Sequence, residues 1–198
     1  MLSSKEIEDQ IKGYKLTFID VRDERIEWGM RLPMFVDTFD KLVQINRQIP
    51  SQDQFVKRYF EDNSENLRQI LSNERLRTAL EARLRRTYPS LVRDLHLNSL
   101  LREKGLQASY NTDVDVTKGV DQIIQYKGKV FHIHSYVGTS WGKFGRKVKN
   151  RRHKFEGLHI DAILDLRAES TKIVGDFYLY SEKDVDYVIQ EMEKKLEK

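Results

Sequence analysis

The chain has 198 residues, of which 39% are hydrophobic and 33% are charged, so it is long enough for one medium domain or two small ones. It contains no cysteine, which excludes a disulfide framework and cysteine-ligated zinc, and no apolar run approaches the roughly 20 residues that a membrane helix needs. The first residues also lack the apolar stretch of a secretory signal peptide, so we expect a soluble cytoplasmic protein.

Residues 1–87 are predicted to form a mostly helical region. Apolar residues recur at helical spacing over 34–49 and 52–61, with a break at Pro50-Ser51. Ser64 is placed to cap a third helix whose apolar pattern continues to Leu84. The weak joint at Thr87-Tyr88-Pro89-Ser90 then divides the chain into 1–87 and 88–198.

Residues 88–198 are predicted to form one α/β domain with both helices and strands. Ser90 is placed to cap a helix over 91–104, and Gly105 to end it. Lys127-Gly128 is typical of a tight hairpin turn between two strands with alternating apolar residues. Ser181 with Asp184 is typical of a capping box that begins the last helix. The predicted strands cover 107–116, 119–126, 129–137, 158–166 and 173–180.

The fold class that follows is α/β (α+β). A mixed β-sheet of about five strands is flanked by helices, and a helical region precedes it.

A basic segment separates the third and fourth predicted strands. Residues 143–154 carry seven cations in twelve residues and no acid, whereas acids slightly outnumber cations in the rest of the chain. Such a concentrated patch on a near-neutral body favours binding to the phosphate backbone of a nucleic acid. A solvated helix face is the alternative, although such faces usually mix both signs. The cations are Lys143, Arg146, Lys147, Lys149, Arg151, Arg152 and Lys154.

Other side chains would extend this surface. Arginines between residues 75 and 86 would widen it, and His153 lies inside the basic segment. Tyr136, Trp141 and Phe144 are placed either to stack on bases or to pack in the core.

One acid and two histidines are candidates for chemistry. Asp121 opens the second predicted strand, and His132 and His134 lie on the third. Residues two apart on a strand share a face, roughly 7 Å from each other. The hairpin brings Asp121 alongside them, so the three side chains would converge on a metal ion or a phosphate. His159 with Asp161, on the fourth strand, is a second candidate pair.

The order of these elements, with Gly119-Val120-Asp121 opening the second strand, resembles the core of the PD-(D/E)xK nuclease superfamily over residues 89–155. The superfamily includes many restriction enzymes and Holliday-junction resolvases. Its members carry an aspartate at the start of one strand and a Glu-x-Lys pair on the next. The resemblance implies that Asp121 binds metal, that Asp94 is an additional acid, and that the helix after the strands contacts DNA. It also favours a homodimer, because two strands must be cut.

The sequence departs from the superfamily pattern at the position of the Glu-x-Lys pair. His132-Ile133-His134 stands where the superfamily has Glu-x-Lys. His132 would then serve as a metal ligand beside Asp121 and Asp94. His134 would transfer protons, since an imidazole titrates near neutral pH. Lys143 or Lys147, on the next element, would replace the missing lysine, and proton transfer by His134 is the alternative.

Three hypotheses follow from these residues. The first is a metal-dependent DNA endonuclease that uses Mg²⁺ or Mn²⁺ on double-stranded DNA. The second is a metal-independent ribonuclease with His132 and His134 as an acid–base pair, and the third is a DNA-binding module without catalysis. Nucleoside triphosphate binding is rejected, because the glycines of 136–142 lack the spacing and the Gly-Lys-Ser/Thr end of a phosphate loop.

Overall fold

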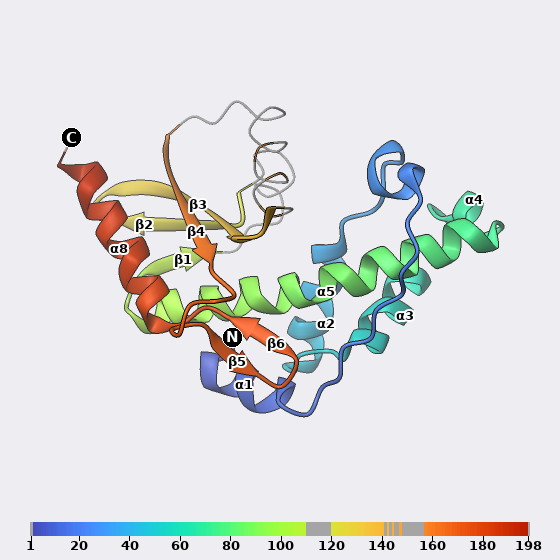
Figure 1. The fold of residues 1–198 in the computed structure, drawn as a ribbon, viewed down its shortest axis with the longest axis horizontal. Coiled ribbons are helices and arrows are strands. Elements are labelled where there is room, and N and C mark those ends of the chain that lie inside the picture. Colours follow the sequence, from blue (N-terminus) through green and yellow to red (C-terminus); the bar gives the residue numbers. More distant parts are fainter. Residues whose placement is uncertain are drawn as a thin grey trace.

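A single long helix organises the fold. The computed structural model describes residues 2–109, 120–140, 142, 144, 147 and 157–197. Helix α5 (Glu74–Glu103) runs through the middle of the molecule, with the main sheet and α8 (Glu182–Leu196) at one end and further helices at the other (Figure 1). These further elements are the π-helical turn η1 (Arg25–Gly29), α2 (Phe35–Asn46), α3 (Gln52–Asp62) and α4 (Arg68–Leu71). Helix α1 (Ser4–Ile11) packs against α5.

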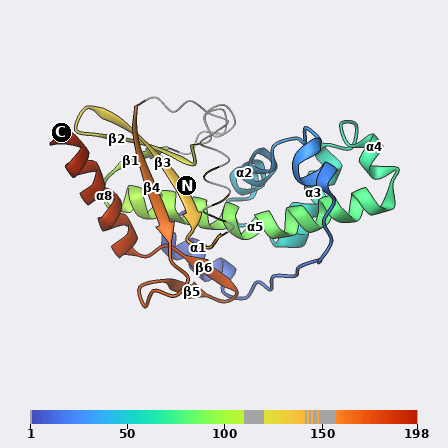
Figure 2. The same ribbon diagram turned by 45° about the horizontal axis from the view of Figure 1, so that its top comes forward.

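The main sheet has four strands in the order β1-β2-β3-β4. The first three strands are antiparallel neighbours, and β3 and β4 are parallel. Helix α5 lies across one side of this sheet (Figure 2). The prediction of a mixed α/β fold is confirmed. The strands are β1 (Gln107–Ser109), β2 (Gln122–Tyr126), β3 (Lys129–Val137) and β4 (Leu158–Leu164).

The predicted β2–β3 hairpin is confirmed. Lys127 and Gly128 both have positive φ angles, 47° and 73°, as a two-residue type I′ turn requires. Such a turn matches the right-handed twist of the flanking strands, and it pairs Tyr126 with Lys129 and Gln122 with Ile133.

The prediction of a fifth strand over 173–180 is wrong. This segment folds into a separate two-stranded sheet, β5 (Lys172–Val174) and β6 (Phe177–Leu179). Gly175 makes the turn with a φ of 56°. A Cβ at this position would lie 2.9 Å from the carbonyl oxygen of Lys12, so glycine is required both by conformation and by space.

The predicted break at residues 87–90 is also wrong, because α5 continues through Pro89. A proline inside a helix leaves the carbonyl of the residue four positions earlier without its usual donor. Here that carbonyl belongs to Arg85, and the side-chain Nε2 of Gln52 donates to it at 3.0 Å. Gln52 is buried at the start of α3, so tertiary packing supplies the missing hydrogen bond.

The single helix predicted from Ser64 onward is interrupted, because α4 covers Arg68–Leu71 and α5 begins at Glu74. Asn73 caps α5, and its side-chain oxygen accepts from the backbone N–H of Leu76 at 3.1 Å. The capping box at Ser181 is confirmed, because the backbone N–H of Ser181 donates to Asp184 at 2.7 Å.

Two hydrophobic cores share α5. The first joins α1, α2 and α3 to most of α5 and also includes Phe177 and Leu179 of β6. The second joins the C-terminal end of α5 to the main sheet and α8. Along α5 they meet between Leu95 and Leu97, so the C-terminal hairpin helps to build the core of the N-terminal helices.

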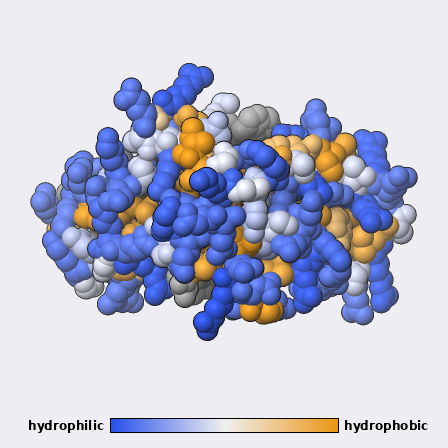
Figure 3. Space-filling view, turned by 90° about the horizontal axis from the view of Figure 1, so that it is seen from below, coloured by the Kyte–Doolittle hydropathy of each residue, from blue (hydrophilic) through white to orange (hydrophobic). Residues whose placement is uncertain are grey.

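The face of the molecule in Figure 3 is largely hydrophilic. On the face in Figure 3, polar side chains surround separate hydrophobic patches. Within the described ranges, no helix combines the length and the apolar character needed to cross a bilayer.

Candidate functional site

Two aspartates from different elements meet at one residue of β3. The carboxylate of Asp121, just before β2, accepts a hydrogen bond from the backbone N–H of Ser135 at 2.7 Å. The carboxylate of Asp94, on α5, accepts from the Ser135 hydroxyl at 2.6 Å. Asp121 is held in place because its own N–H donates to the carbonyl of Ile133 at 3.0 Å. We call Asp94, Asp121 and Ser135 the aspartate site.

A buried polar network supports this site. Gln122 donates to the carbonyl of Asp94 at 2.8 Å and accepts from the side chain of Asn98 at 2.7 Å. Tyr180 lies close enough to Asp94 and Asp121 to feel their charges, and its hydroxyl donates to the carbonyl of Ala162 at 3.0 Å. Burial raises the pKa of Tyr180, and the nearby charges of Asp94 and Asp121 add to the shift. Tyr180 therefore stays protonated beside the two acids.

The histidines occupy the other face of β3. Side chains alternate along a strand, and Phe131, Ile133 and Ser135 point to the α5 side. His132 and His134 therefore point away from α5. In the parallel pairing with β4 they stand opposite His159 and Asp161, respectively.

Three imidazole rings gather on that face. His134 Nε2 lies 2.9 Å from His159 Nδ1, and the two rings stack. The ring of His132 meets that of His159 edge-on, with centroids 4.8 Å apart. One of the two nitrogens must carry a hydrogen and donate, and the other must accept the hydrogen bond, because two imidazole nitrogens pair only in that way. His134 is only 1% exposed, so a substrate does not reach it in this conformation.

The structure therefore divides the predicted site residues between two faces. Asp94 and Asp121 are brought together at Ser135, whereas the expected ligand His132 lies on the opposite face from Asp94. Among the described residues, no group of three His, Asp or Glu side chains is arranged to hold a metal ion. The aspartate pair alone still offers oxygen ligands, and Mg²⁺ is commonly held by one or two carboxylates together with several waters.

The basic segment connects two parallel strands. The chain has to return from the end of β3 to the start of β4, and residues 138–157 make this connection. Lys147 is exposed and helical within it, and Phe144 is 49% exposed. The remaining residues predicted for nucleic-acid contact lie outside the described residues: Trp141, Lys143, Arg146, Lys149, Arg151, Arg152, His153 and Lys154.

Two of the α5 arginines, Arg85 and Arg86, make internal contacts with other parts of the protein. Arg85 pairs with Asp53 at 2.8 Å and with Glu81 at 2.9 Å. Arg86 donates to the carbonyl of Val21 at 3.0 Å and pairs with Glu27. These guanidinium groups are occupied by the protein, so they fasten α3 and the segment before α2 to α5.

Sequence reasoning missed Ser135, Gln122 and Asn98. The signal for Ser135 was its position, since it is a polar residue on a strand face that otherwise carries Phe131, Ile133 and Val137. A buried polar residue in such a row needs hydrogen-bond partners. Gln122 is likewise a polar residue on the same face of β2 as the buried Ile124, and Asn98 is a polar residue on the buried face of α5.

Comparisons with models of protein families, with curated proteins and with solved structures found no match for this chain.

Proposed function

We propose that this protein binds double-stranded DNA and cleaves it with a divalent metal ion, as a divergent relative of the PD-(D/E)xK nucleases. The observation that carries the proposal is the convergence of Asp94 and Asp121 on Ser135. The resemblance implies an acid on the helix and an acid at the start of the second strand. These two acids now stand at the same residue of the third strand.

The order of elements supports the same proposal. Helix α5 is followed by three antiparallel strands, then by the basic segment, and then by β4 parallel to β3. This order agrees with the elements on which the resemblance was based. The basic segment therefore follows β3, the strand that carries Ser135, and leads to β4 on the other side of that strand.

The reaction would be the hydrolysis of a phosphodiester bond. Water attacks phosphorus, the bond to one ester oxygen breaks, and that oxygen leaves with a proton as an alcohol. A divalent cation held by Asp94 and Asp121 would supply positive charge for the developing phosphorane and lower the pKa of the attacking water. Ser135 orients both carboxylates through its N–H and its hydroxyl. Lys147 and the other cations of the basic segment would hold the DNA backbone.

The test is a cleavage assay on DNA and RNA of matched sequence with Mg²⁺, Mn²⁺ or a chelator. Asp94→Asn and Asp121→Asn should each reduce metal-dependent DNA cleavage by roughly 100-fold or more, since each removes a charged ligand. Asp186→Asn is the matched control, because it changes the charge equally on α8, where Asp186 pairs only with Lys104 among described residues. DNA cleavage that is equal in wild type and Asp121→Asn would refute the proposal.

A second candidate is DNA binding without cleavage. One observation favours it: on the α5 face of β3, the positions beyond Ile133 hold Ser135 and Val137, which are neither an acid nor a lysine. Salt-dependent DNA binding together with an absence of cleavage under every metal condition would support this candidate. Cleavage of RNA alone, in the presence of chelator, would instead support the metal-independent ribonuclease.

A further inference from the structure

A cavity distinct from the aspartate site lies among α1, α2 and α5, and Asn98 in its wall belongs to the polar network that supports that site. It has a volume of about 570 Å³, in the range of small-molecule sites. Its apolar wall is formed by Leu2, Val43 and Leu95. Its polar residues include Asp40 of α2 and Asn98 of α5.

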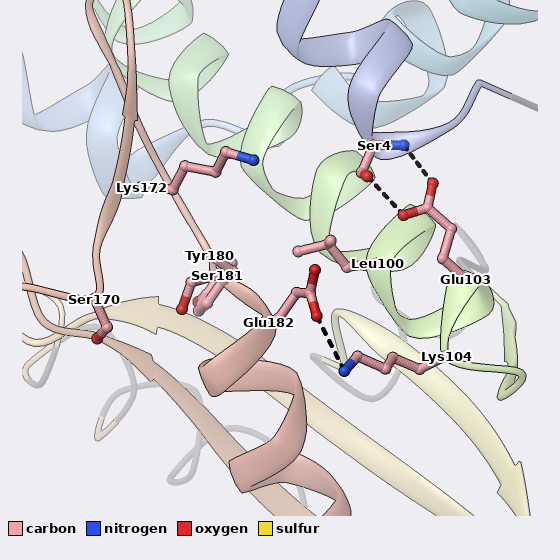
Figure 4. A pocket seen from close by; sticks show the side chains of 9 residues that line it. All are labelled: Ser4, Leu100, Glu103, Lys104, Ser170, Lys172, Tyr180, Ser181 and Glu182. Carbon is pink, nitrogen blue, oxygen red and sulfur yellow. Dashed lines mark hydrogen bonds and ion pairs between the residues drawn. The ribbon is translucent and has the colours of Figure 1, made fainter.

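The cavity in Figure 4, between α1, α5 and α8, is different because its polar walls are already paired. Ser4 donates to Glu103 through its N–H and its hydroxyl, at 2.7 and 2.6 Å. Lys104 pairs with Glu182 at 3.2 Å. Lys172 pairs with Glu8, which Figure 4 does not draw, at 2.6 Å. These charges are already balanced within the protein.

Asn98, one of the residues that line the cavity among α1, α2 and α5, carries a buried and unsatisfied acceptor. Gln122 Nε2 donates to the carbonyl of Asp94, so Gln122 Oε1 is the atom that accepts from Asn98 Nδ2. This chain of hydrogen bonds fixes the orientation of both amides. Asn98 Oδ1 is consequently left as a buried acceptor with no donor in the structure. Such a group costs stability unless a partner supplies an N–H or O–H.

Asp40 brings a carboxylate to the same cavity. Burial raises the pKa of Asp40 to about 7, and the nearby charge of Asp37 adds to the shift. Its carboxylate forms no ion pair or hydrogen bond with any other described residue. Glu6 adds a second acid to the rim, against the single cation Arg47. The cavity is therefore rich in acceptors and bears a negative balance.

From this arrangement we infer that the cavity binds a small organic cation with N–H donors, an amidinium, guanidinium or primary ammonium group carried on an apolar body. The cationic head would pair with Asp40 and donate to Asn98 Oδ1. The apolar body would pack on Leu2, Val43 and Leu95. A cation fits better than a neutral donor because it also neutralises a carboxylate that has no partner among the described residues.

The test uses benzamidine as the cationic probe and benzamide as its neutral analogue of the same shape. Isothermal titration of the full chain at pH 8, where Asp40 is mostly charged, should give saturable 1:1 binding of benzamidine. Asp40→Asn should weaken that binding roughly tenfold or more, the value of one charge-assisted pair. Asp9→Asn should leave it unchanged, because Asp9 is exposed on α1, pairs with Lys5 and does not line the cavity.

The position of the probe is checked independently of its affinity. Benzamidine should shift the NMR signal of the Asn98 side-chain amide and the methyl signals of Val43. Equal affinity of wild type and Asp40→Asn, equal binding of benzamide, or no saturable binding would each overturn the inference. None of these outcomes bears on DNA cleavage, so this site and the aspartate site succeed or fail separately.

Discussion

Replacing Gln52 by alanine tests why α5 continues through Pro89. Gln52 Nε2 donates to the carbonyl of Arg85, whose usual donor is missing at Pro89. Gln52 Oε1 also accepts from the backbone N–H of Thr17 at 2.9 Å. Each buried group left without a partner costs about 1–3 kcal/mol. Because Thr17 is exposed, water can satisfy its N–H, so we expect Gln52→Ala to lower the free energy of unfolding by about 1–3 kcal/mol, mainly through the Arg85 carbonyl.

Pro89→Ala isolates one of these two hydrogen bonds. An alanine at position 89 restores the backbone N–H that pairs with the Arg85 carbonyl. In wild type the restored N–H adds little stability, because Gln52 Nε2 already donates a hydrogen bond to the Arg85 carbonyl. In Gln52→Ala it rescues an unpaired carbonyl, so Pro89→Ala should stabilise that variant by about 1–2 kcal/mol more than it stabilises wild type.

The measurement is a double-mutant cycle by urea unfolding of the four proteins. A coupling free energy of at least about 1 kcal/mol between positions 52 and 89 would support the reasoning. If the two substitutions were additive within about 0.5 kcal/mol, Gln52 would not be the group that lets the helix pass through proline.

Three further predictions concern ionisable groups. Burial lowers the pKa of His96 from 6.5, so the unfolded chain binds the extra proton; stability should fall as the pH drops below 6.5, with the difference between wild type and His96→Gln changing by at most about 1.4 kcal/mol at pH 5.5. The pKa of Asp40 is raised from 3.8 to about 7, so its effect on stability has the opposite sign, and stability is lost as the pH rises toward 7. Asp40→Asn should therefore be more stable than wild type at pH 8, by at most about 4 kcal/mol, as measured by thermal and urea unfolding. If Lys147 neutralises one phosphate, Lys147→Ala should weaken DNA binding and reduce the slope of the logarithm of the binding constant against the logarithm of the salt concentration by about 0.9. An unchanged slope would place Lys147 away from the DNA.

The local parts of the fold were predictable from sequence because their causes are local. Lys127-Gly128 fixed the β2–β3 hairpin through its own backbone angles, and Ser181 with Asp184 fixed the start of α8. The predicted bounds of β3 agree with the structure at both ends, since its apolar alternation is a property of the strand itself.

The failures were of another kind, because long-range contacts decided them. Pro89 is a sound breaking signal in an isolated helix, but Gln52, 37 positions earlier, supplies the missing donor. The turn at Gly175 separates β5 from β6, and β6 then joins a core built by helices at the other end of the chain. No local pattern reports on which core a strand will join.

Part of the candidate site was also predictable from sequence. Asp121 and Asp94 were identified from position and resemblance, and the structure brings them together. The ligand role predicted for His132 depended on the assumption that the histidines face the same side as the acids. Strand alternation leaves that choice open until the buried face is known. Ser135 decides it, because its hydroxyl bonds to Asp94 on the α5 side.

This division of β3 into two faces leads to a last prediction, which separates catalysis from structure. His134 is almost fully buried and hydrogen-bonded to His159, so His134→Ala should cost about 1–3 kcal/mol by leaving His159 Nδ1 without that partner. The same variant should retain DNA cleavage within a few fold at a temperature where it is folded, whereas Asp121→Asn should lose cleavage and keep its stability more nearly intact. His134→Gln keeps a polar group in place and should recover part of the stability, which checks that the loss arises from the hydrogen bond. If His134→Ala stayed folded and lost cleavage as completely as Asp121→Asn, the reacting groups would lie on the histidine face, and the aspartate site would serve to hold β2, β3 and α5 together.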